Sequence, residues 1–297
     1  MDEATAARLR ALGSGFNLPE VQALYAPLLA AQPREGVRLL ADQAYGPHAR
    51  HRADVYRPDG TGTSTSRPVL VWLHGGGFIR GDKAARANLG WWGARQGFVV
   101  VLPNYRLAPE TRWPGGPEDV ARLWAWLQQQ APRHGGDPAR TVLAGESAGA
   151  AHVAAAVLMR RFQPAGWAPA GAALLSGPYH ARLEGLARAA FGIATPDPRN
   201  EAYFGPDPAA WAEASIVEHV DAAPLPLWIS YAERDLVQMQ VQAGELFARL
   251  VSRHGFQPEL RVLREHNHFS GGFSFGTDDH SVSAPLADFV RACTGGA

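Results

Sequence analysis

From Pro68 to the C-terminus, short apolar runs alternate with longer stretches that have helical periodicity. Near-continuous apolar runs are typical of strands buried on both faces, and such strands belong to parallel sheets whose connecting helices cover both faces. The pattern therefore predicts an α/β fold with a mostly parallel central sheet. The expected strands are Val69–Leu73, Phe98–Leu102, Thr141–Ala144, Ala172–Leu175, Leu227–Tyr231 and Leu260–Leu263, and the expected helices are Glu118–Gln130, Ala148–Arg161, Gln240–His254 and Ala284–Ala292.

The N-terminal part of the chain has a different pattern. Apolar residues recur at helical spacing over Glu20–Ala31, and Pro33 ends this expected helix. Two extended stretches follow, at Val37–Ala44 and Arg52–Tyr56. After them comes a segment rich in Gly, Thr and Ser, Asp59–Ser66, which we expect to be a surface turn.

The domain organisation is inferred from the length and from the absence of internal boundaries. A chain of 297 residues suits one large α/β domain as well as two small ones. Because the sequence contains no internal repeat and no clear linker, we expect a single domain over residues 1–297. Within it, residues 1–50 and about 179–217 are candidate elements of a small helical cap.

The composition excludes several classes of protein. Hydrophobic residues make up 46% of the chain and charged residues 19%, which favours a sizeable core over disorder. The 28 Lys and Arg balance the 28 Asp and Glu, so we expect neither a nucleic-acid partner nor an anionic membrane surface. There is no run of roughly 18 apolar residues and no signal-peptide layout, and the only cysteine, Cys293, has no internal partner. We expect a soluble, cytoplasmic protein and leave a homodimer open.

The motif G-x-S-x-G occurs twice, and only one copy has the context that nucleophilic catalysis requires. The motif places a serine on a tight turn between a strand and a helix. Gly145–Gly149 (GESAG) follows the expected strand Thr141–Ala144 and precedes a run of strong helix formers. Gly272–Gly276 (GFSFG) has no strand before it and no helix after it. We therefore predict that Ser147 is the nucleophile and that Ser274 is a structural turn serine.

A glycine-rich loop, His74–Phe78 (HGGGF), directly follows the first expected strand of the alternating region. Backbone N–H groups in such a loop stabilise the negative charge that develops on oxygen during acyl transfer, and glycine allows the close approach this needs. We predict an oxyanion hole made by the N–H groups of Gly76, Gly77 and Ala148. His74 is interpreted as a hydrogen-bonding anchor of the loop rather than as a proton carrier.

An acid must follow the nucleophile, because the chain order of this arrangement is Ser, then Asp or Glu, then His. The expected strand Leu227–Tyr231 ends shortly before Glu233 and Asp235. Side chains at the carboxyl ends of parallel strands meet at the same edge of the sheet. We predict that Asp235 is the acid. Glu233 is the alternative, and otherwise it is a solvated loop charge.

Three histidines are candidates for the base. His266 and His268 follow the expected strand Leu260–Leu263, and His280 begins the last expected helix. We predict that His268 is the base, with His266 and His280 as alternatives, and we expect His152 to be a packing or surface residue. This chemistry needs no metal and no organic cofactor, and the histidines show no zinc-ligand spacing, so we expect neither.

Together these motifs resemble the hormone-sensitive-lipase-like carboxylesterases of the α/β-hydrolase superfamily. The resemblance implies a catalytic triad of Ser147, Asp235 and His268, and an oxyanion hole that includes Gly76 and Gly77. The residue patterns predict the same set. The matching segments are Asp54–Pro58 (DVYRP), His74–Asp82 (HGGGFIRGD), Asn104–Glu110 (NYRLAPE), Gly145–Gly149, Tyr231–Asp235 and His268–Phe269.

The resemblance implies an α/β-hydrolase fold and the hydrolysis of carboxylic esters with short to medium acyl or aromatic groups. The expected partner is thus a small-molecule ester, and Phe78, Tyr179 and Phe204 are candidate substrate-binding residues. Residues 45–56 look more like the feruloyl-esterase and kynurenine-formamidase branch, so an arylformamidase-type amidase is the alternative. Formamidases tend to carry a histidine before the nucleophile, and Glu146 at that position favours esters.

Overall fold

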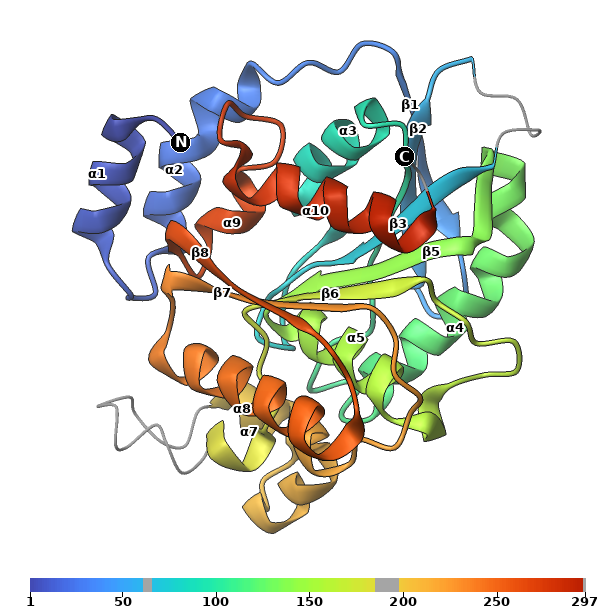
Figure 1. Cartoon of the computed structure of the whole chain (residues 1–297), viewed down its shortest axis with the longest axis vertical. Helices are drawn as coiled ribbons and strands as arrows, with labels where there is room; N and C mark the ends of the chain where they lie inside the picture. Colours follow the sequence, from blue (N-terminus) through green and yellow to red (C-terminus); the bar gives the residue numbers. More distant parts are fainter. Residues whose placement is uncertain (61–65, 185–197, 296–297) are drawn as a thin grey trace.

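A computed structural model describes residues 1–60, 66–184 and 198–295, and its centre is one sheet of eight strands (Figure 1). The strands are β1 (Val37–Ala44), β2 (Arg52–Pro58), β3 (Arg67–Leu73), β4 (Val99–Pro103), β5 (Gly136–Glu146), β6 (Gly171–Leu175), β7 (Leu227–Arg234) and β8 (Glu259–Asn267). They lie in the order β1-β2-β4-β3-β5-β6-β7-β8. The pairs β1–β2 and β2–β4 are antiparallel, and all pairs from β4 to β8 are parallel. The predicted mostly parallel sheet is confirmed.

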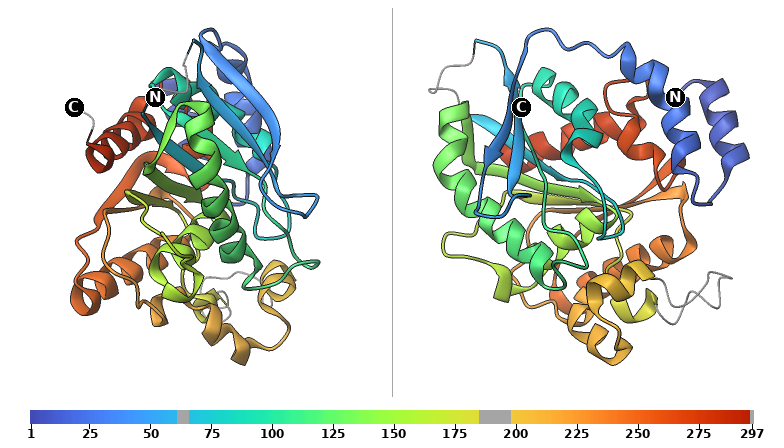
Figure 2. Two further views of the ribbon diagram at one scale, coloured as in Figure 1. Left: turned by 90° about the vertical axis from the view of Figure 1, so that its right-hand side faces the viewer. Right: turned by 180° about the vertical axis from the view of Figure 1, so that it is seen from behind.

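Helices cover both faces of this sheet and also lie beyond one of its ends. They are α1 (Glu3–Leu12), α2 (Leu18–Ala30), α3 (Ala87–Arg95), α4 (Gly115–Gln130), α5 (Ala148–Leu158), α7 (Pro198–Phe204), α8 (Val237–His254), α9 (Ser270–Phe273) and α10 (His280–Thr294), with short 3₁₀ turns η1 (Lys83–Arg86), η2 (Ala131–His134), η3 (Arg160–Phe162), η4 (Pro208–Ala214) and η5 (Ile216–Glu218). Helices α3 and α10 lie on one face, and α4, α5 and α8 lie on the other (Figures 1 and 2). This is the layered α/β arrangement that the alternating sequence predicts.

The core consists of two apolar layers, one on each face of the sheet. Successive side chains of a strand point to opposite faces. Val71 and Leu73 of β3 therefore pack in the layer that contains α4, α5 and α8. Leu70 and Trp72, between them, pack in the layer that contains α3 and α10. Because both faces are buried, the strand reads as a continuous apolar run in the sequence.

Helix α3 was not foreseen from the sequence, because two glycines interrupt its helical pattern. The structure explains both of them by close packing on the sheet. A Cβ added to Gly90 would lie 2.5 Å from the ring of Tyr56, and one added to Gly93 would lie 2.6 Å from a methyl group of Val100. The glycines thus lower the intrinsic helix propensity and at the same time let the helix approach β2 and β4.

Of the two stretches proposed as cap elements, the first falls only partly outside the sheet, and the described part of the second contains no strand. Of residues 1–50, Val37–Ala44 forms the edge strand β1, whereas α1 and α2 lie off the other end of the sheet beside β8 and α9 (Figure 1). The helix α1, which the sequence analysis missed, packs with α2 around Tyr25 and Phe273. Of the stretch 179–217, residues 185–197 lie outside the described part of the chain, as do residues 61–65 of the expected surface turn.

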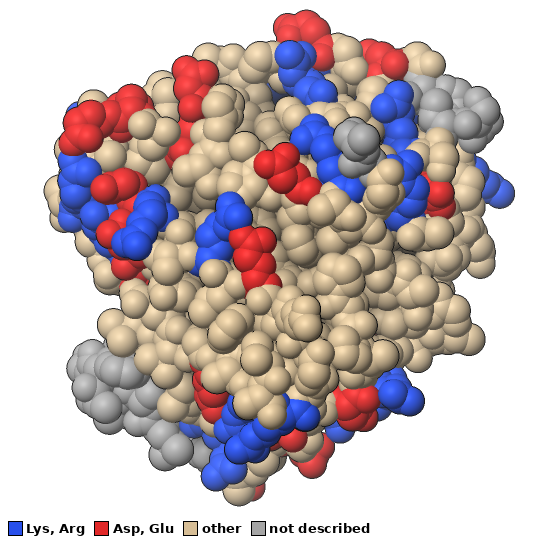
Figure 3. Space-filling model, viewed as in Figure 1, with Lys and Arg blue, Asp and Glu red and all other residues tan. Residues whose placement is uncertain are grey.

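The surface carries charges of both signs. On the face seen in Figure 3, the Lys and Arg residues are interspersed with Asp and Glu rather than gathered into one patch. The two signs also balance over the whole chain, with 28 residues of each. Within the described ranges, no helix is both long enough and apolar enough to cross a membrane.

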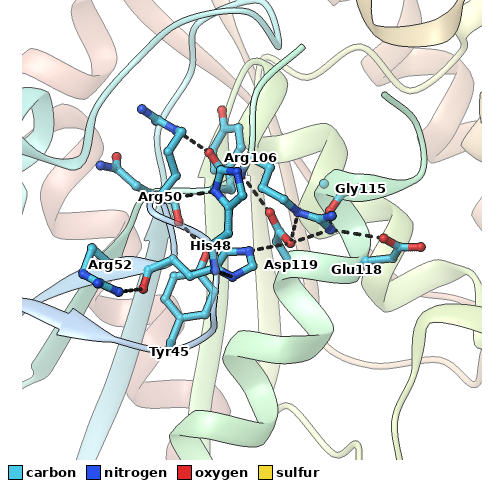
Figure 4. A network of polar contacts seen from close by, with 12 residues as sticks. Tyr45, His48, Arg50, Arg52, Arg106, Gly115, Glu118 and Asp119 are labelled. Atoms are coloured by element: carbon cyan, nitrogen blue, oxygen red, sulfur yellow. Dashed lines mark hydrogen bonds and ion pairs between the residues drawn. The ribbon is translucent and has the colours of Figure 1, made fainter. Parts of the chain in front are cut away.

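A buried carboxylate fixes the loop after β4 to helix α4 (Figure 4). The carboxylate of Asp119 accepts hydrogen bonds from the backbone N–H and the Nε of Arg106, both at 2.8 Å. The ring of His51 lies 3.0 Å from the same carboxylate. Arg50, which directly precedes His51, donates to the carbonyl oxygens of Tyr105, at 2.7 Å, and Gly81, at 2.9 Å. These contacts hold together the segment before β2, the loop after β4 and the start of α4.

We predict that Asp119→Asn lowers the free energy of unfolding by about 3 kcal/mol, because it removes the buried carboxylate of the Arg106 ion pair and leaves only the exposed one of Glu118. The matched control is Glu118→Gln, which removes the other carboxylate paired with Arg106. The side chain of Glu118 is 52% exposed and that of Asp119 is 1% exposed, so the control costs less than about 1 kcal/mol. Urea unfolding of the two variants measures the difference. Equal losses would contradict the role assigned to Asp119.

Candidate active site

Ser147 occupies a strained turn between the end of β5 and the start of α5. Its backbone angles are φ 52° and ψ −123°, which residues with a side chain rarely adopt. A Cβ at Gly145 would lie 2.6 Å from the carbonyl group of Gly149, and one at Gly149 would lie 2.3 Å from the carbonyl oxygen of Leu73. The N–H of Ser147 donates to the Leu175 carbonyl at 2.8 Å. The turn is therefore wedged between the ends of β3 and β6.

The serine of the second G-x-S-x-G copy, Ser274, has a different setting. It follows α9 directly, has an ordinary φ of −71°, and is fully buried. Its hydroxyl donates to the carbonyl oxygen of Gly271 at 2.9 Å. Ser274 thus closes a turn, as its sequence context predicts.

The structure brings Ser147, His268 and Asp235 into one chain of contacts. Asp235 is the first residue after β7, and His268 is the first residue after β8. The distance from His268 Nε2 to Ser147 Oγ is 3.1 Å, and that from His268 Nδ1 to Asp235 Oδ1 is 2.6 Å. When Asp235 accepts the Nδ1–H, the lone pair of Nε2 faces the serine hydroxyl and can take its proton.

The carboxylate of Asp235 is fully buried and held on both oxygens. Oδ1 accepts from the Leu236 N–H at 2.9 Å, and Oδ2 accepts from the Ala232 N–H at 2.9 Å and from the hydroxyl of Ser176. Ser176 directly follows β6 and has a φ of 52°. Sequence reasoning missed this residue. The signal that could have found it is its position. It is a serine at the carboxyl end of β6, and β6 lies between the strand that precedes Ser147 and the strand that precedes Asp235.

The alternatives for the acid and the base lie outside this chain of contacts. Glu233 accepts a hydrogen bond from the N–H of Glu265 at 2.8 Å. His266 is buried between two serine hydroxyls, each 2.8 Å from one of its ring nitrogens. His280 is exposed at the start of α10. None of the three lines the cavity beside Ser147.

The predicted oxyanion donors face that cavity. Within the described residues, the backbone N–H groups of Gly76, Gly77 and Ala148 donate to no protein acceptor. Gly76 has φ 144°, and a Cβ there would lie 1.8 Å from the carbonyl oxygen of Arg80, so only glycine fits. Ala148 begins α5, whose positive dipole end points the same way. The arrangement can stabilise negative charge on an oxygen next to Ser147.

The glycine-rich loop is fixed from two sides. Glu146 accepts from the Gly75 N–H at 3.3 Å and from Arg86 Nε at 2.6 Å. On the other side, Nδ1 of His74 lies 2.7 Å from the Gly75 carbonyl, and the hydroxyl of Tyr105 donates to the His74 carbonyl at 2.7 Å. Burial lowers the pKa of His74 to about 4. A neutral, buried ring is what an anchor of the loop requires.

A cavity of about 270 Å³ opens beside Ser147. It is lined by the glycine-rich loop and the segment after it, the start of α5, the segment around the start of α2, residues 199–200, the start of α8 and the segment 268–273, together with Pro178 and Glu184. Its apolar lining includes Phe16, Leu18, Phe78, Leu236, Met239 and Phe273. Polar residues also line it, among them Gln22, Arg80, Arg86, Glu184, Arg199, Asn200 and Gln238.

Two of the three predicted substrate-binding aromatics do not line this cavity. Phe78 does, and its ring stacks on Tyr203 at 4.3 Å. Phe204 packs against Phe78 from behind, with ring centroids 5.3 Å apart. Tyr179 is fully buried, and its hydroxyl accepts from the Gly177 N–H at 3.2 Å. The predictions for Tyr179 and Phe204 are therefore wrong, because aromatic side chains near a site are often part of the core.

His152 is a packing residue and not a surface residue. Its ring lies in contact with Tyr105, Phe78 and Tyr203, at centroid distances of 4.6, 5.4 and 5.5 Å. Burial lowers its pKa to about 3. Among the residues that the structure describes, no group of three or more His, Cys, Asp or Glu side chains could hold a metal ion.

We predict that Gly149→Ala lowers both stability and turnover, because the new Cβ pushes α5 away from the end of β3 and displaces Ser147. We expect a loss of at least about 2 kcal/mol in unfolding free energy, as for overpacking in a core. The matched control is Gly244→Ala in α8, where an added Cβ meets nothing within 4 Å. That variant gains about 0.5–1 kcal/mol from helix propensity. Chemical denaturation and turnover of both variants test the comparison.

We predict that the protein loses stability as the pH falls from about 6.5 toward about 4. Burial lowers the pKa of His74 and His266 to about 4 and that of His152 to about 3, whereas in the unfolded chain each titrates near 6.5. Between these values the unfolded state binds more protons than the folded state, so acid favours unfolding.

His152→Leu tests this linkage. Between about pH 7.5 and about pH 5, the variant should lose about 2 kcal/mol less of its unfolding free energy than the wild type does. His280→Leu, at an exposed position, should keep the wild-type pH dependence. Urea unfolding at the two pH values is the measurement. An unchanged pH dependence in His152→Leu would show that the ring is not held neutral.

Solved structures share this fold over nearly the whole chain. Esterase B from Lactobacillus rhamnosis aligns with 99% of this chain and 96% of its own, with a TM-score of 0.76 and 18% identity. A bacterial heroin esterase aligns with 99% of this chain and 97% of its own, with a TM-score of 0.74 and 26% identity. The predicted α/β-hydrolase fold is confirmed.

Curated relatives match a shorter region. An ethyl acetate hydrolase of Pseudomonas putida is 35% identical over 96 residues, which are 32% of this chain and 30% of that protein. A carboxylesterase of Mycobacterium tuberculosis is 42% identical over 87 residues, which are 28% of this chain and 26% of that protein. The matched region thus spans less than a third of each relative.

The pattern of the alpha/beta hydrolase fold family matches residues 70–270. This region begins within β3 and ends at the start of α9, so it includes the glycine-rich loop, Ser147, Asp235 and His268. It also covers more than half of the chain. The predicted resemblance is confirmed, and the chain belongs to the α/β-hydrolase fold family.

Proposed function

We propose that this chain is a serine hydrolase that cleaves carboxylic esters through an acyl-enzyme on Ser147. The observation that carries the proposal is the contact chain from Asp235 through His268 to Ser147, at 2.6 and 3.1 Å, beside backbone N–H groups that face the cavity. Nucleophile, base, orienting acid and oxyanion donors are the complete set for acyl transfer.

Each residue has one task in this mechanism. His268 Nε2 takes the proton of Ser147 as Oγ attacks the ester carbonyl carbon. The N–H groups of Gly76, Gly77 and Ala148 stabilise the resulting oxyanion. His268 then gives the proton to the departing alkoxide, which leaves as an alcohol. A water molecule, deprotonated by the same ring, attacks the acyl-enzyme and releases the acid.

The substrates are esters with short to medium acyl or aromatic groups. A cavity of about 270 Å³ suits a small ester, and its partly apolar lining suits an acyl chain or ring. The names of two relatives, an ethyl acetate hydrolase and a heroin esterase, also refer to small esters. This supports the ester reading over the arylformamidase alternative, which no feature of the described site favours.

The cap is part of the same proposal. Residues 1–297 form one domain in which the helices near the N-terminus and the segment around α7 cover the active site. Phe16, Leu18 and Asn200 support this, because they line the cavity from segments that lie outside the sheet. A cytoplasmic location and a homodimer stay predictions.

We predict that Ser147→Ala lowers kcat by at least about 10³-fold on phenyl and ethyl esters of increasing acyl length. Ser274→Ala, the serine of the other G-x-S-x-G copy, should keep kcat within about threefold, because it loses only one turn hydrogen bond. His268→Ala should match the loss of Ser147→Ala. Wild-type turnover in Ser147→Ala would end the proposal, and faster cleavage of formanilides than of matched phenyl esters would establish the amidase instead.

A further inference from the structure

Gln238 is a polar residue of the cavity lining that the mechanism above does not use. It is the second residue of α8, three positions after Asp235, and its side chain is completely buried while lining the cavity. Within the described part of the chain, neither its Nε2 nor its Oε1 has a hydrogen-bond partner. Buried amide groups are nearly always paired, so an amide left unpaired at a cavity wall is available to a ligand.

The neighbouring wall is polar and already organised. Glu184 also lines the cavity and is 1% exposed. Its carboxylate accepts from Asn200 Nδ2 at 3.2 Å and from the side-chain amide of Gln242. Asn200 and Gln242 are themselves buried, so these contacts fix the carboxylate from α7 and from α8. This part of the cavity lining is therefore built for hydrogen bonding.

The chemistry of this wall selects the kind of group that fits. An amide offers a donor and an acceptor together, and a hydroxyl group is the smallest substituent that can satisfy both. A carboxylate could only accept, so it would leave the oxygen of the amide unpaired. An alkyl group would leave the amide of Gln238 unpaired.

We propose that Gln238 forms a subsite that recognises a hydroxyl group on the ester substrate, so that the enzyme prefers hydroxylated esters over their alkyl analogues. This deepens the proposed function and rests on it. The hydroxyl belongs either to the acyl group or to the alcohol group of the ester. In both cases, the amide of Gln238 pairs with it while the carbonyl carbon lies next to Ser147.

Two matched substrate pairs test the subsite, and each replaces a methyl group by a hydroxyl. Ethyl 3-hydroxybutanoate against ethyl 3-methylbutanoate probes the acyl side, and 2-hydroxyethyl butanoate against propyl butanoate probes the alcohol side. In the wild type, kcat/KM of the hydroxylated member should exceed that of its partner by about tenfold or more in one of the pairs. The pair that shows the preference identifies which side of the ester reaches Gln238.

Gln238→Met keeps the length of the side chain and removes both polar atoms. It should abolish the preference, because kcat/KM on the hydroxylated ester falls by about tenfold or more relative to kcat/KM on its alkyl partner. The control is Gln22→Met, a glutamine that lines the same cavity at an exposed position, and it should retain the preference. Gln238→Met should also unfold at the same temperature as the wild type or a higher one, because no internal hydrogen bond is lost.

The outcomes separate this proposal from the one on which it rests. If the wild type cleaves none of the four esters, ester hydrolysis itself is wrong. If it cleaves them without preference, or if Gln238→Met keeps the preference, the subsite is wrong and the hydrolase remains. A stronger preference for a carboxylate-bearing analogue, monoethyl succinate over ethyl pentanoate, would also overturn the hydroxyl subsite, because it would assign recognition to the cationic side chains of the cavity.

Discussion

The contact between α5 and the end of β3 is the constraint on which the site depends. Gly149 lies so close to the Leu73 carbonyl oxygen that an added Cβ would be 2.3 Å from it. This approach forces the chain from β5 into α5 through the strained conformation of Ser147 at φ 52°. The same contact brings the glycine-rich loop that follows β3 beside the serine, so that a Cβ on Gly75 would lie 3.2 Å from that of Ser147. The proposed nucleophile and the proposed oxyanion donors are thus positioned by one packing contact.

Parallel strands explain why residues far apart in the sequence meet at this point. Ser147, Ser176, Asp235 and His268 each directly follow a different strand, and these strands, β5 to β8, are neighbours in the sheet. A side chain at the carboxyl end of a parallel strand necessarily reaches the same edge as its neighbours. The structure places Asp235 and His268, the predicted acid and base, in the chain of contacts with Ser147, and it places Glu233 and His266 outside it. The chain order could be predicted, but the strand ends could not: β7 was expected to end at Tyr231 and ends at Arg234, and β8 was expected to end at Leu263 and ends at Asn267.

The features that the sequence could not predict depend on tertiary packing, that is, on which neighbours a residue contacts in the folded chain. Tyr179 and Phe204 were expected at the cavity because they are aromatic and near the site, yet both belong to the packing behind it. The helix α3 was missed because Gly90 and Gly93 serve packing on β2 and β4 rather than helix propensity. Gln238 gives no signal at all in the sequence, since an amphipathic helix normally carries glutamine on its exposed face. Only the tertiary structure shows that this residue faces inward.

The buried polar groups around the site differ in how they are stabilised, and the difference bears on function. His74 and His152 are held neutral by burial, with lowered pKa values, and His74 serves to fix the loop next to the oxyanion donors. Asp235 instead has both oxygens fully hydrogen-bonded, which keeps its carboxylate oriented toward His268. Gln238 differs from these histidines and from Asp235. Its amide does not ionise, and within the described chain it has no hydrogen-bond partner. An unpaired amide lowers stability without supporting the fold, so its partner is most simply sought in the substrate.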